Sequence, residues 1–96
     1  MTNPSSALEA AARFLGPEYV VKYGEIRYNN ARWINDGELL DALLRRAAER
    51  NLWPMLCMTV SGHAWRCDFM AKGNDPCDGP TPLAAVLAAV AALEGT

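Results

Sequence analysis

Histidine and clustered cysteine are scarce in this 96-residue chain, which holds one histidine and three cysteines. The cysteines stand apart at positions 57, 67 and 77, whereas zinc sites are usually built from ligands about two to four residues apart. We therefore expect neither a bound metal nor another cofactor. His63 follows Ser61-Gly62, so we interpret it as a solvent-facing turn residue rather than a catalytic base.

Glycine-rich loops and nucleophile motifs are also missing. The glycines are scattered singly, which gives no loop that could cradle a phosphate, and Ser61 lies outside any Gly-x-Ser-x-Gly elbow. Asp75 and Asp78 flank Pro76, but their spacing does not fit an EF-hand loop and suits an ordinary turn. The sequence thus predicts a protein that is not an enzyme.

Long apolar runs and excess basic charge are absent as well. The longest apolar run, Leu83 to Leu93, is well short of the roughly 20 residues that a membrane-spanning helix needs. The first residues lack the pattern of a signal peptide, and an odd cysteine count suggests a reducing compartment, so we expect a cytoplasmic protein.

The net charge of −2 argues against direct nucleic-acid binding. Arg45, Arg46 and Arg50 are expected to form a solvated helix face, with Trp33 and Trp53 partly buried near its ends.

The chain is organised around a predicted apolar hairpin, PMLCMTVSGHAWRCDFMA, that starts at Pro54. A turn at Ser61-Gly62 sets Met58 opposite Trp65 and Leu56 opposite Cys67. The predicted core face then carries Leu56, Met58, Val60, Trp65, Cys67 and Phe69, and the other, partly wet face carries Met55, Cys57, Thr59, Ala64, Arg66 and Asp68. Cys57 and Cys67 fall on opposite faces, which disfavours a disulfide between them.

The remaining elements follow from caps and periodicity. A first helix is expected to begin at a capping box of Ser6 and Glu9 and to close at Gly16-Pro17. Residues 19–28 predict a hairpin about Tyr23-Gly24, or alternatively one bent strand. A second helix is expected from Asn35 or Asp36 to about Arg50. A loop then leads to a last helix that Thr81 caps and Pro82 begins.

One domain, residues 1–96, accounts for all of these elements, because the chain shows no repeat or linker. The expected fold class is α+β, with helices packed on an antiparallel sheet in the order α-β-β-α-β-β-α.

Three features of the C-terminal two thirds together resemble a known family. They are a helix that starts at Asn35-Asp36, a hairpin with Trp65 on its second strand, and the segment Gly79-Pro80-Thr81-Pro82-Leu83 that opens an alanine-rich helix. This arrangement, over roughly residues 33 to 95, resembles the small phage proteins called phage ABA sandwich domains. The resemblance implies a phage or prophage protein in the bacterial cytoplasm and supplies no active site.

The function we expect is therefore non-catalytic binding that blocks a host macromolecule, and most specifically inhibition of a bacterial defence system in the manner of anti-CRISPR proteins. An acidic surface that meets a basic partner would use Asp36, Glu38, Asp41, Asp68, Asp75 and Asp78. One alternative is a homodimeric phage accessory module with weak nucleic-acid binding, which would associate through Ala84, Ala88, Ala91 and Ala92 of the last helix. The second alternative is a small metal protein or enzyme based on His63 and the cysteines.

Overall fold

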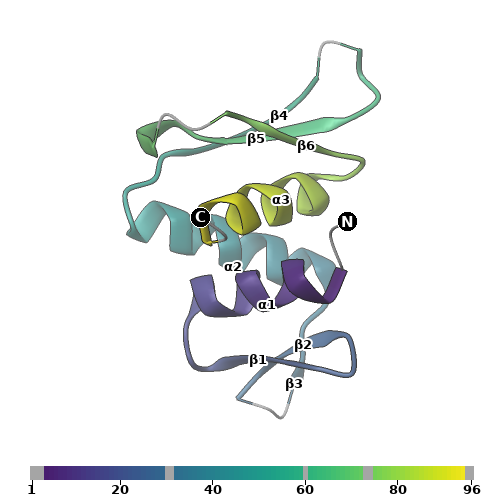
Figure 1. Cartoon of the computed structure of the whole chain (residues 1–96), viewed down its shortest axis with the longest axis vertical. Helices are drawn as coiled ribbons and strands as arrows, with labels where there is room; N and C mark the ends of the chain where they lie inside the picture. Colours follow the sequence, from purple (N-terminus) through teal and green to yellow (C-terminus); the bar gives the residue numbers. More distant parts are fainter. Residues whose placement is uncertain (1–3, 30–31, 60, 73–74, 95–96) are drawn as a thin grey trace.

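Three helices lie between two small antiparallel sheets in the computed structural model, which describes residues 4–29, 32–59, 61–72 and 75–94 (Figure 1). The helices are α1 (Pro4–Leu15), α2 (Asp36–Glu49) and α3 (Pro82–Glu94). One sheet contains β1 (Tyr19–Lys22), β2 (Glu25–Tyr28) and β3 (Arg32–Trp33), and the other contains β4 (Pro54–Met58), β5 (Trp65–Phe69) and β6 (Cys77–Gly79), with a short 3₁₀ turn at Met70–Lys72. The expected α+β class is confirmed.

Helix α1 begins three residues before Ala7, the first helical residue that a cap at Ser6 predicted. Its first residue is Pro4, which suits the first helical position because proline's fixed φ is helical and its missing N–H has no partner there in any case. Ser6 therefore lies inside the first turn, and the predicted capping box of Ser6 and Glu9 is wrong. The helix ends as expected at Gly16, whose N–H donates to the carbonyl of Ala12 at 3.0 Å and whose φ is 131°.

The first hairpin has the predicted register, so the alternative of a single bent strand is excluded. Tyr19 pairs with Tyr28 and Val21 with Ile26, and the two tyrosine rings lie 5.2 Å apart. Tyr23 and Gly24 both have positive φ, at 55° and 73°, which are the signs that a tight type I′ turn requires. Strand β3 then pairs with β2 and was not predicted, because two residues are too few to show a strand period.

Helix α2 begins where its cap predicted. The side chain of Asn35 accepts a hydrogen bond from the backbone N–H of Glu38 at 2.9 Å, and its Nδ2 donates to the Glu38 carboxylate at 3.0 Å. These two bonds satisfy a free N–H at the start of the helix and hold the acidic first turn in place. Leu39, Leu43 and Ala47 are the buried residues of the predicted apolar stripe.

The second hairpin also has the predicted register, with Leu56 opposite Cys67 and Met58 opposite Trp65. Cys67 and Phe69 are buried on the predicted core face, and all three cysteines are free thiols. Met58 is the exception: it is 52% exposed, because it stands at the strand end, so its placement in the core was wrong. Val60 lies outside the described residues. The following loop contains the unpredicted β6, which pairs Cys77 with Cys67.

Helix α3 is the central element of the fold. Its cap is the predicted one, since Thr81 Oγ1 accepts from the N–H of Ala84 at 3.1 Å. The helix contacts β5 and β6 on one side and both α1 and α2 on the others. Val86, Val90, Ala85 and Ala89 are all buried, so α3 is enclosed on more than the single face that its leucines and valines predicted.

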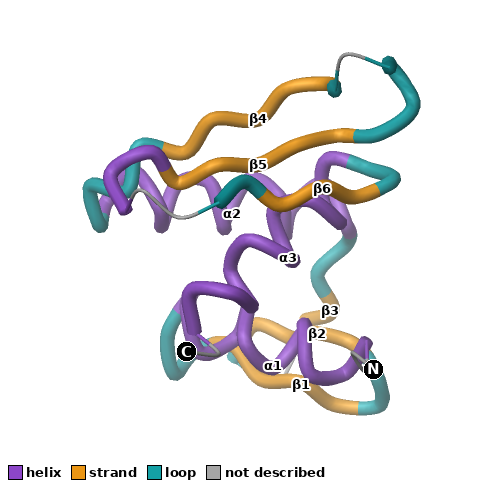
Figure 2. Tube along the Cα trace, turned by 45° about the horizontal axis from the view of Figure 1, so that its top comes forward, coloured by secondary structure: helices purple, strands orange, loops and turns teal. Residues whose placement is uncertain are grey.

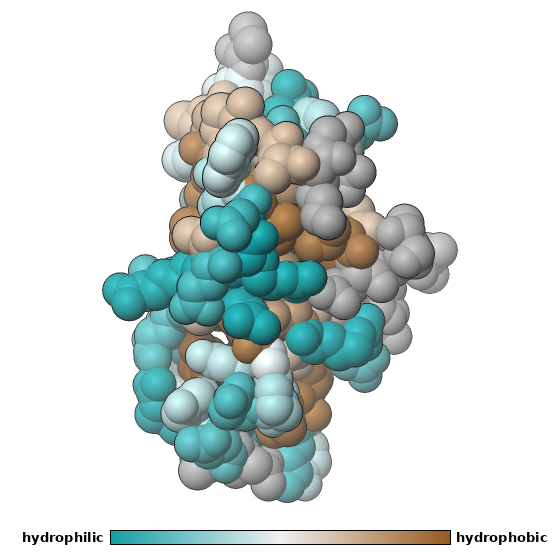
Figure 3. Space-filling model, turned by 90° about the vertical axis from the view of Figure 1, so that its left-hand side faces the viewer, coloured by the Kyte–Doolittle hydropathy of each residue, from teal (hydrophilic) through white to brown (hydrophobic). Residues whose placement is uncertain are grey.

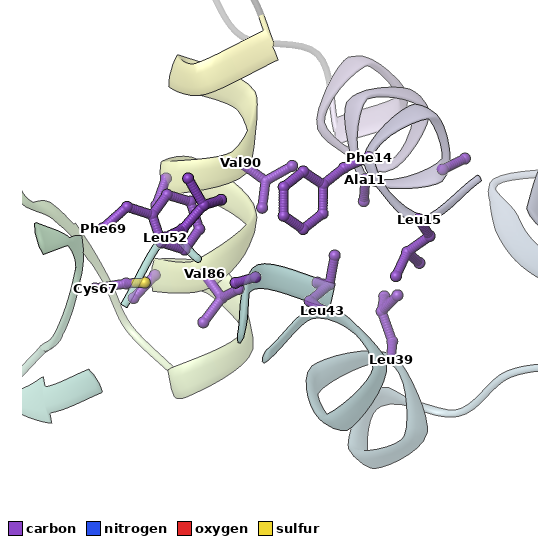
Figure 4. Close-up of a cluster of buried hydrophobic side chains, with 14 of the residues drawn as sticks. Ala11, Phe14, Leu15, Leu39, Leu43, Leu52, Cys67, Phe69, Val86 and Val90 are labelled. Atoms are coloured by element: carbon purple, nitrogen blue, oxygen red, sulfur yellow. The ribbon is translucent and has the colours of Figure 1, made fainter. Parts of the chain in front are cut away.

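One hydrophobic core joins the two sheets through the helices. Figure 4 shows Phe14 of α1, Val86 and Val90 of α3 and Phe69 of β5 converging on the same interior. The rings of Phe14 and Phe69 are stacked with centroids 6.3 Å apart. Because this core fills one side of each sheet, the other side of each sheet faces outward.

Candidate protein-interaction surface

The sheet of β4, β5 and β6 is covered on one side only. Helix α3 packs against the side that carries Cys67 and Phe69, and side chains alternate along a strand, so the residues between them point away from the helices. We use the name outer face for the strand residues of this side, which are Met55, Cys57, Arg66, Asp68 and Asp78, together with Trp53 and Met70, which lie next to them where β4 begins and β5 ends. Figure 1 shows the sheet at one end of the molecule with the three helices on a single side of it.

Large apolar side chains are exposed on the outer face. Trp53 is 69% exposed, Met70 54% and Met55 45%. Trp53 and Met70 lie on adjacent segments, since the N–H of Met70 donates to the carbonyl of Trp53 at 3.3 Å. Met55 is opposite Asp68 in the next position of the ladder. These side chains form an apolar strip along one end of the sheet, of the kind that marks interaction sites.

Trp53 is held in a backbone conformation that disfavours its side chain. Its φ is 53°, in the left-handed region that bulky residues rarely adopt. The conformation is set by its neighbours: Leu52 is buried and its N–H donates to the carbonyl of Ala47 at 2.9 Å, while Trp53 accepts from Met70. The chain thus turns from α2 into β4 over a fixed path that leaves the indole in solvent, whereas the sequence predicted a partly buried ring. Trp33 is likewise 54% exposed, so that prediction was wrong for both tryptophans.

Charged groups lie beside the apolar strip. Arg66 Nε donates to Asp78 Oδ1 at 2.8 Å and its Nη2 donates to Asp78 Oδ2 at 3.2 Å, and this hydrogen-bonded arginine holds the pKa of Asp78 below its ordinary value. Asp68 stands on the same central strand. Its Oδ1 is shielded from solvent and accepts no hydrogen bond within the part of the chain that the structure describes.

The acidic residues predicted to contact a partner are divided between two places. Glu38 and Asp41 lie on the first turns of α2, where Glu38 is paired with Arg32 and Asp41 with Arg45 at 2.8 Å. Asp36 is exposed at the same helix start. Asp68, Asp75 and Asp78 belong to the other sheet and the loop that enters it, at the opposite end of the molecule from β3, which leads into α2 (Figure 1). The structure therefore does not bring the six residues into one acidic surface.

The alanine face of the last helix is largely enclosed. Ala84, Ala88 and Ala91 are half-buried within the chain itself, and Ala92 is exposed. Helix α1 packs closely against α3, and its own Ala10 and Ala11 are buried. Small residues here allow two helices to approach each other within the monomer, which leaves less of this face available for a second copy than the sequence predicted.

The arginines of α2 act within the fold. Arg46 Nε donates to the carbonyl of Phe14 at the end of α1 at 3.2 Å, and the guanidinium of Arg50 lies 4.9 Å from the centre of the Phe14 ring, a cation–π distance. Arg45 pairs with Asp41. Figure 3 shows hydrophilic residues as a band across the middle of the molecule, at the height of α2. The contacts of Arg46 and Arg50 with Phe14 fasten α1 to α2, and the Asp41 carboxylate offsets the charge of Arg45.

His63 and the cysteines are the residues on which a metal site or an enzyme was predicted to depend. Burial raises the pKa of the Cys67 thiol to about 11, and burial also raises the pKa of Cys77, its neighbour across the strands, so both remain protonated at neutral pH. His63 is exposed in the loop between β4 and β5. Among the described residues, no three of the His, Cys, Asp and Glu side chains are grouped to hold a metal ion.

A shallow hollow of about 470 Å³ lies between the end of α1 and β1. It is lined by Glu9, Ala12, Arg13, Gly16, Pro17, Tyr19, Val20 and Val21. The lining includes no serine, cysteine or histidine, and burial raises the pKa of Tyr19, which disfavours the phenolate. The hollow offers a surface for contact and no nucleophile.

Comparisons with known proteins leave the chain without an assigned relative. No protein-family model, no curated protein and no solved structure matches it. The resemblance to phage ABA sandwich domains stays a prediction. Within the described residues, no helix is long and apolar enough to cross a membrane.

Sequence reasoning placed Met55 and Cys57 on the wet side of the sheet but did not identify the apolar strip. The sequence pattern did not include Trp53 and Met70, because both lie outside the strands. They lie next to each other only because of the path that the backbone takes after α2. A tryptophan next to the proline that opens a strand was the one hint in the sequence.

Proposed function

We propose that this protein is a non-catalytic binding module that engages another protein through the outer face. The observation that carries the proposal is the exposure of Met55 on the sheet and of Trp53 and Met70 on the two adjacent segments beside it. Tryptophan and methionine are enriched at the centres of protein interfaces. A strip of exposed apolar side chains lowers the solubility of a protein, so its presence indicates a binding surface.

Trp53 is the residue expected to contribute most to binding. It offers the largest exposed apolar surface on this face, and its position on a constrained backbone means that little freedom is lost when a partner covers it. Buried tryptophans at interface centres contribute about 2 kcal/mol or more.

The partner that we propose is a protein complex of a bacterial defence system, which the chain would inhibit in the bacterial cytoplasm. Support comes from the family resemblance, the small size and the acidic balance of the chain. The resemblance bears on this setting alone, because the observed order of layers (sheet, helices, sheet) is the reverse of the helix, sheet, helix order that the family's name denotes.

The alternative of a nucleic-acid-binding accessory module has less support. Arg45, Arg46 and Arg50, on which it depended, are engaged with Asp41 and with Phe14. The alternative of a metal protein or an enzyme lacks a grouped set of side chains in the described part of the chain.

The test is an affinity capture with the tagged protein from lysate of bacteria that carry active defence complexes, followed by mass spectrometry. Trp53→Ala is the test variant and Trp33→Ala the matched control, since Trp33 is an exposed tryptophan on the opposite sheet. We expect one defence effector to be enriched by the wild type and by Trp33→Ala but not by Trp53→Ala.

Phage plaque counts on the same host supply the functional readout. Expression of the wild type should raise plaque formation by a defence-sensitive phage, and Trp53→Ala should not. Binding that is indifferent to Trp53, or the absence of any captured effector together with unchanged plaque counts, would refute the proposal.

A further inference from the structure

We propose that two copies of this chain associate through strand β4, which pairs antiparallel with itself about a two-fold axis at Leu56 and joins the two three-stranded sheets into one of six strands. The inference goes beyond the proposed function and does not depend on it, because backbone groups at the edge of the sheet make the contact; Met55 and Cys57 are the residues of the outer face that also take part.

Strand β4 is an open edge. The strand order is β4-β5-β6, so within the described part of the chain β4 has a paired neighbour on one side only, and Figure 2 shows it as the outermost strand at that end of the molecule. Edge strands present unpaired N–H and C=O groups and are usually protected by charge, by proline or by a bulge. β1, β3 and β6 carry Lys22, Arg32 and Asp78 respectively, whereas β4 carries no charged residue and has a proline, Pro54, only at its first position.

The hydrogen bonds at the ends of β4 show which of its backbone groups face outward. The N–H of Thr59 donates to the carbonyl of Ala64 at 2.9 Å, and that of Met70 donates to the carbonyl of Trp53 at 3.3 Å. Hydrogen-bonded pairs alternate in an antiparallel ladder, so Met55 and Cys57 also direct their backbone groups to β5. The groups of Pro54, Leu56 and Met58 therefore point to the open edge.

Self-pairing about Leu56 matches these outward groups to one another. Leu56 exchanges N–H and C=O bonds with Leu56 of the second copy, and the N–H of Met58 reaches the carbonyl of Pro54 in the second copy. Four hydrogen bonds form across the axis. Pro54 has no N–H to offer, and in this register only the carbonyl of Met58, at the solvent-exposed end of the strand, lacks a donor.

The side chains fit the same arrangement. On the outer face Met55 stands opposite Cys57 of the second copy, twice, and on the inner side Met58 stands opposite Pro54. All of these contacts are apolar, and no like charges meet across the axis. Pairing covers Met55 and Met58, which are 45% and 52% exposed in the single chain. The two outer faces then lie on the same side of one sheet.

The register is tested by a designed crosslink. Met55→Cys sets a thiol opposite Cys57 of the second copy in a non-hydrogen-bonded pair, where the Cα atoms are about 4.5 Å apart and a disulfide can form. Diamide, which removes one hydrogen from each thiol and is itself reduced to the hydrazine, should convert Met55→Cys to a covalent dimer on a non-reducing gel. The double variant Met55→Cys with Cys57→Ser should not crosslink. Wild-type crosslinking through Cys57 alone would overturn this register.

Backbone pairing is tested by two substitutions at one exposed site. Met58→Pro removes the N–H that crosses the axis without removing a bond to β5, whereas Met58→Thr keeps that N–H. Analytical ultracentrifugation of the untagged chain should show twice the chain mass for the wild type and for Met58→Thr, and the single mass for Met58→Pro. A single mass for the wild type up to 200 µM, or equal loss of the dimer in both variants, would overturn the proposal. Circular dichroism and thermal melting verify that each variant is folded, and the crosslink decides the question if Met58→Pro is not.

Discussion

Gly79 of β6 lies against the first turn of α3 so closely that a Cβ at this position would be 2.6 Å from the backbone nitrogen of Ala85. Cβ atoms essentially never approach another heavy atom within 3.0 Å, and a backbone atom inside a helix cannot move aside alone. Gly79→Ala must therefore push α3 away from the sheet. We expect it to lower the free energy of unfolding by about 1–3 kcal/mol, as overpacking does, measured by urea denaturation.

Gly37→Ala is the matched control for this prediction. Gly37 lies in the first turn of α2, and a Cβ there meets only the Oδ1 of Asn35, at an ordinary distance of 3.5 Å. Alanine is the better helix former, so this variant should be as stable as the wild type or more stable, by up to about 1 kcal/mol. Equal urea midpoints for the two variants would contradict the close approach of β6 to α3.

The turn at Tyr23-Gly24 offers a stabilising substitution. Tyr23 has a φ of 55° and is 85% exposed, so its side chain gains little from packing while its backbone is in a region that suits asparagine. Tyr23→Asn should raise the free energy of unfolding by roughly 0.5–1 kcal/mol, seen as a higher melting temperature.

Tyr23→Ala distinguishes the effect of removing the tyrosine ring from the effect of asparagine's preference for positive φ. It removes the ring, including its contact with Lys22 Nζ at 5.8 Å, without supplying a residue that favours positive φ. It should melt at or below the wild-type temperature. A gain as large as that of Tyr23→Asn would mean that the tyrosine side chain itself, and not the backbone conformation, opposes folding.

The sequence predicted those parts of the fold whose residues carry a repeating pattern or a strong cap. Both hairpin registers followed from alternation, and α2 followed from Asn35. Strands β3 and β6 did not, because two or three residues are too few to show a strand period. The outer face lay between these cases: alternation placed Met55 and Cys57, but the exposure of Trp53 depends on a backbone path that no local pattern specifies.

Substitution of Trp53 should weaken binding to the partner without lowering the stability of the fold. Its φ of 53° costs folding energy in a residue with a large side chain, and its 69% exposure limits what the ring gains in return. Trp53→Asn should therefore leave the free energy of unfolding unchanged or raise it by up to about 1 kcal/mol. Binding to the captured partner should weaken by at least about tenfold, in the range of an interface hot spot.

Calorimetry of unfolding and titration of the purified partner measure the two quantities on the same protein sample. Trp33→Asn is the control for loss of an exposed tryptophan, and it should leave the affinity unchanged. A large loss of stability in Trp53→Asn would show that the indole packs in the fold, and unchanged affinity would remove Trp53 from the interface.

The buried Cys67 thiol should make the protein less stable in alkaline solution. Burial raises the pKa of Cys67 from an ordinary value of about 9 to about 11, with a smaller contribution from Cys77. The unfolded chain therefore loses this proton at a lower pH than the folded chain, so the folded state binds more protons and stability falls as pH rises. The loss starts near pH 9, amounts to roughly 1.5 kcal/mol by pH 10 and levels off above about 11. Cys77 and Tyr19, whose pKa values burial also raises, act in the same direction.

Urea denaturation at pH 7, 9 and 10 measures how stability depends on pH, and Cys67→Ala should reduce this dependence despite a lower stability at pH 7. A slope that Cys67→Ala leaves unchanged would assign the alkaline loss to the other groups and contradict the prediction for Cys67.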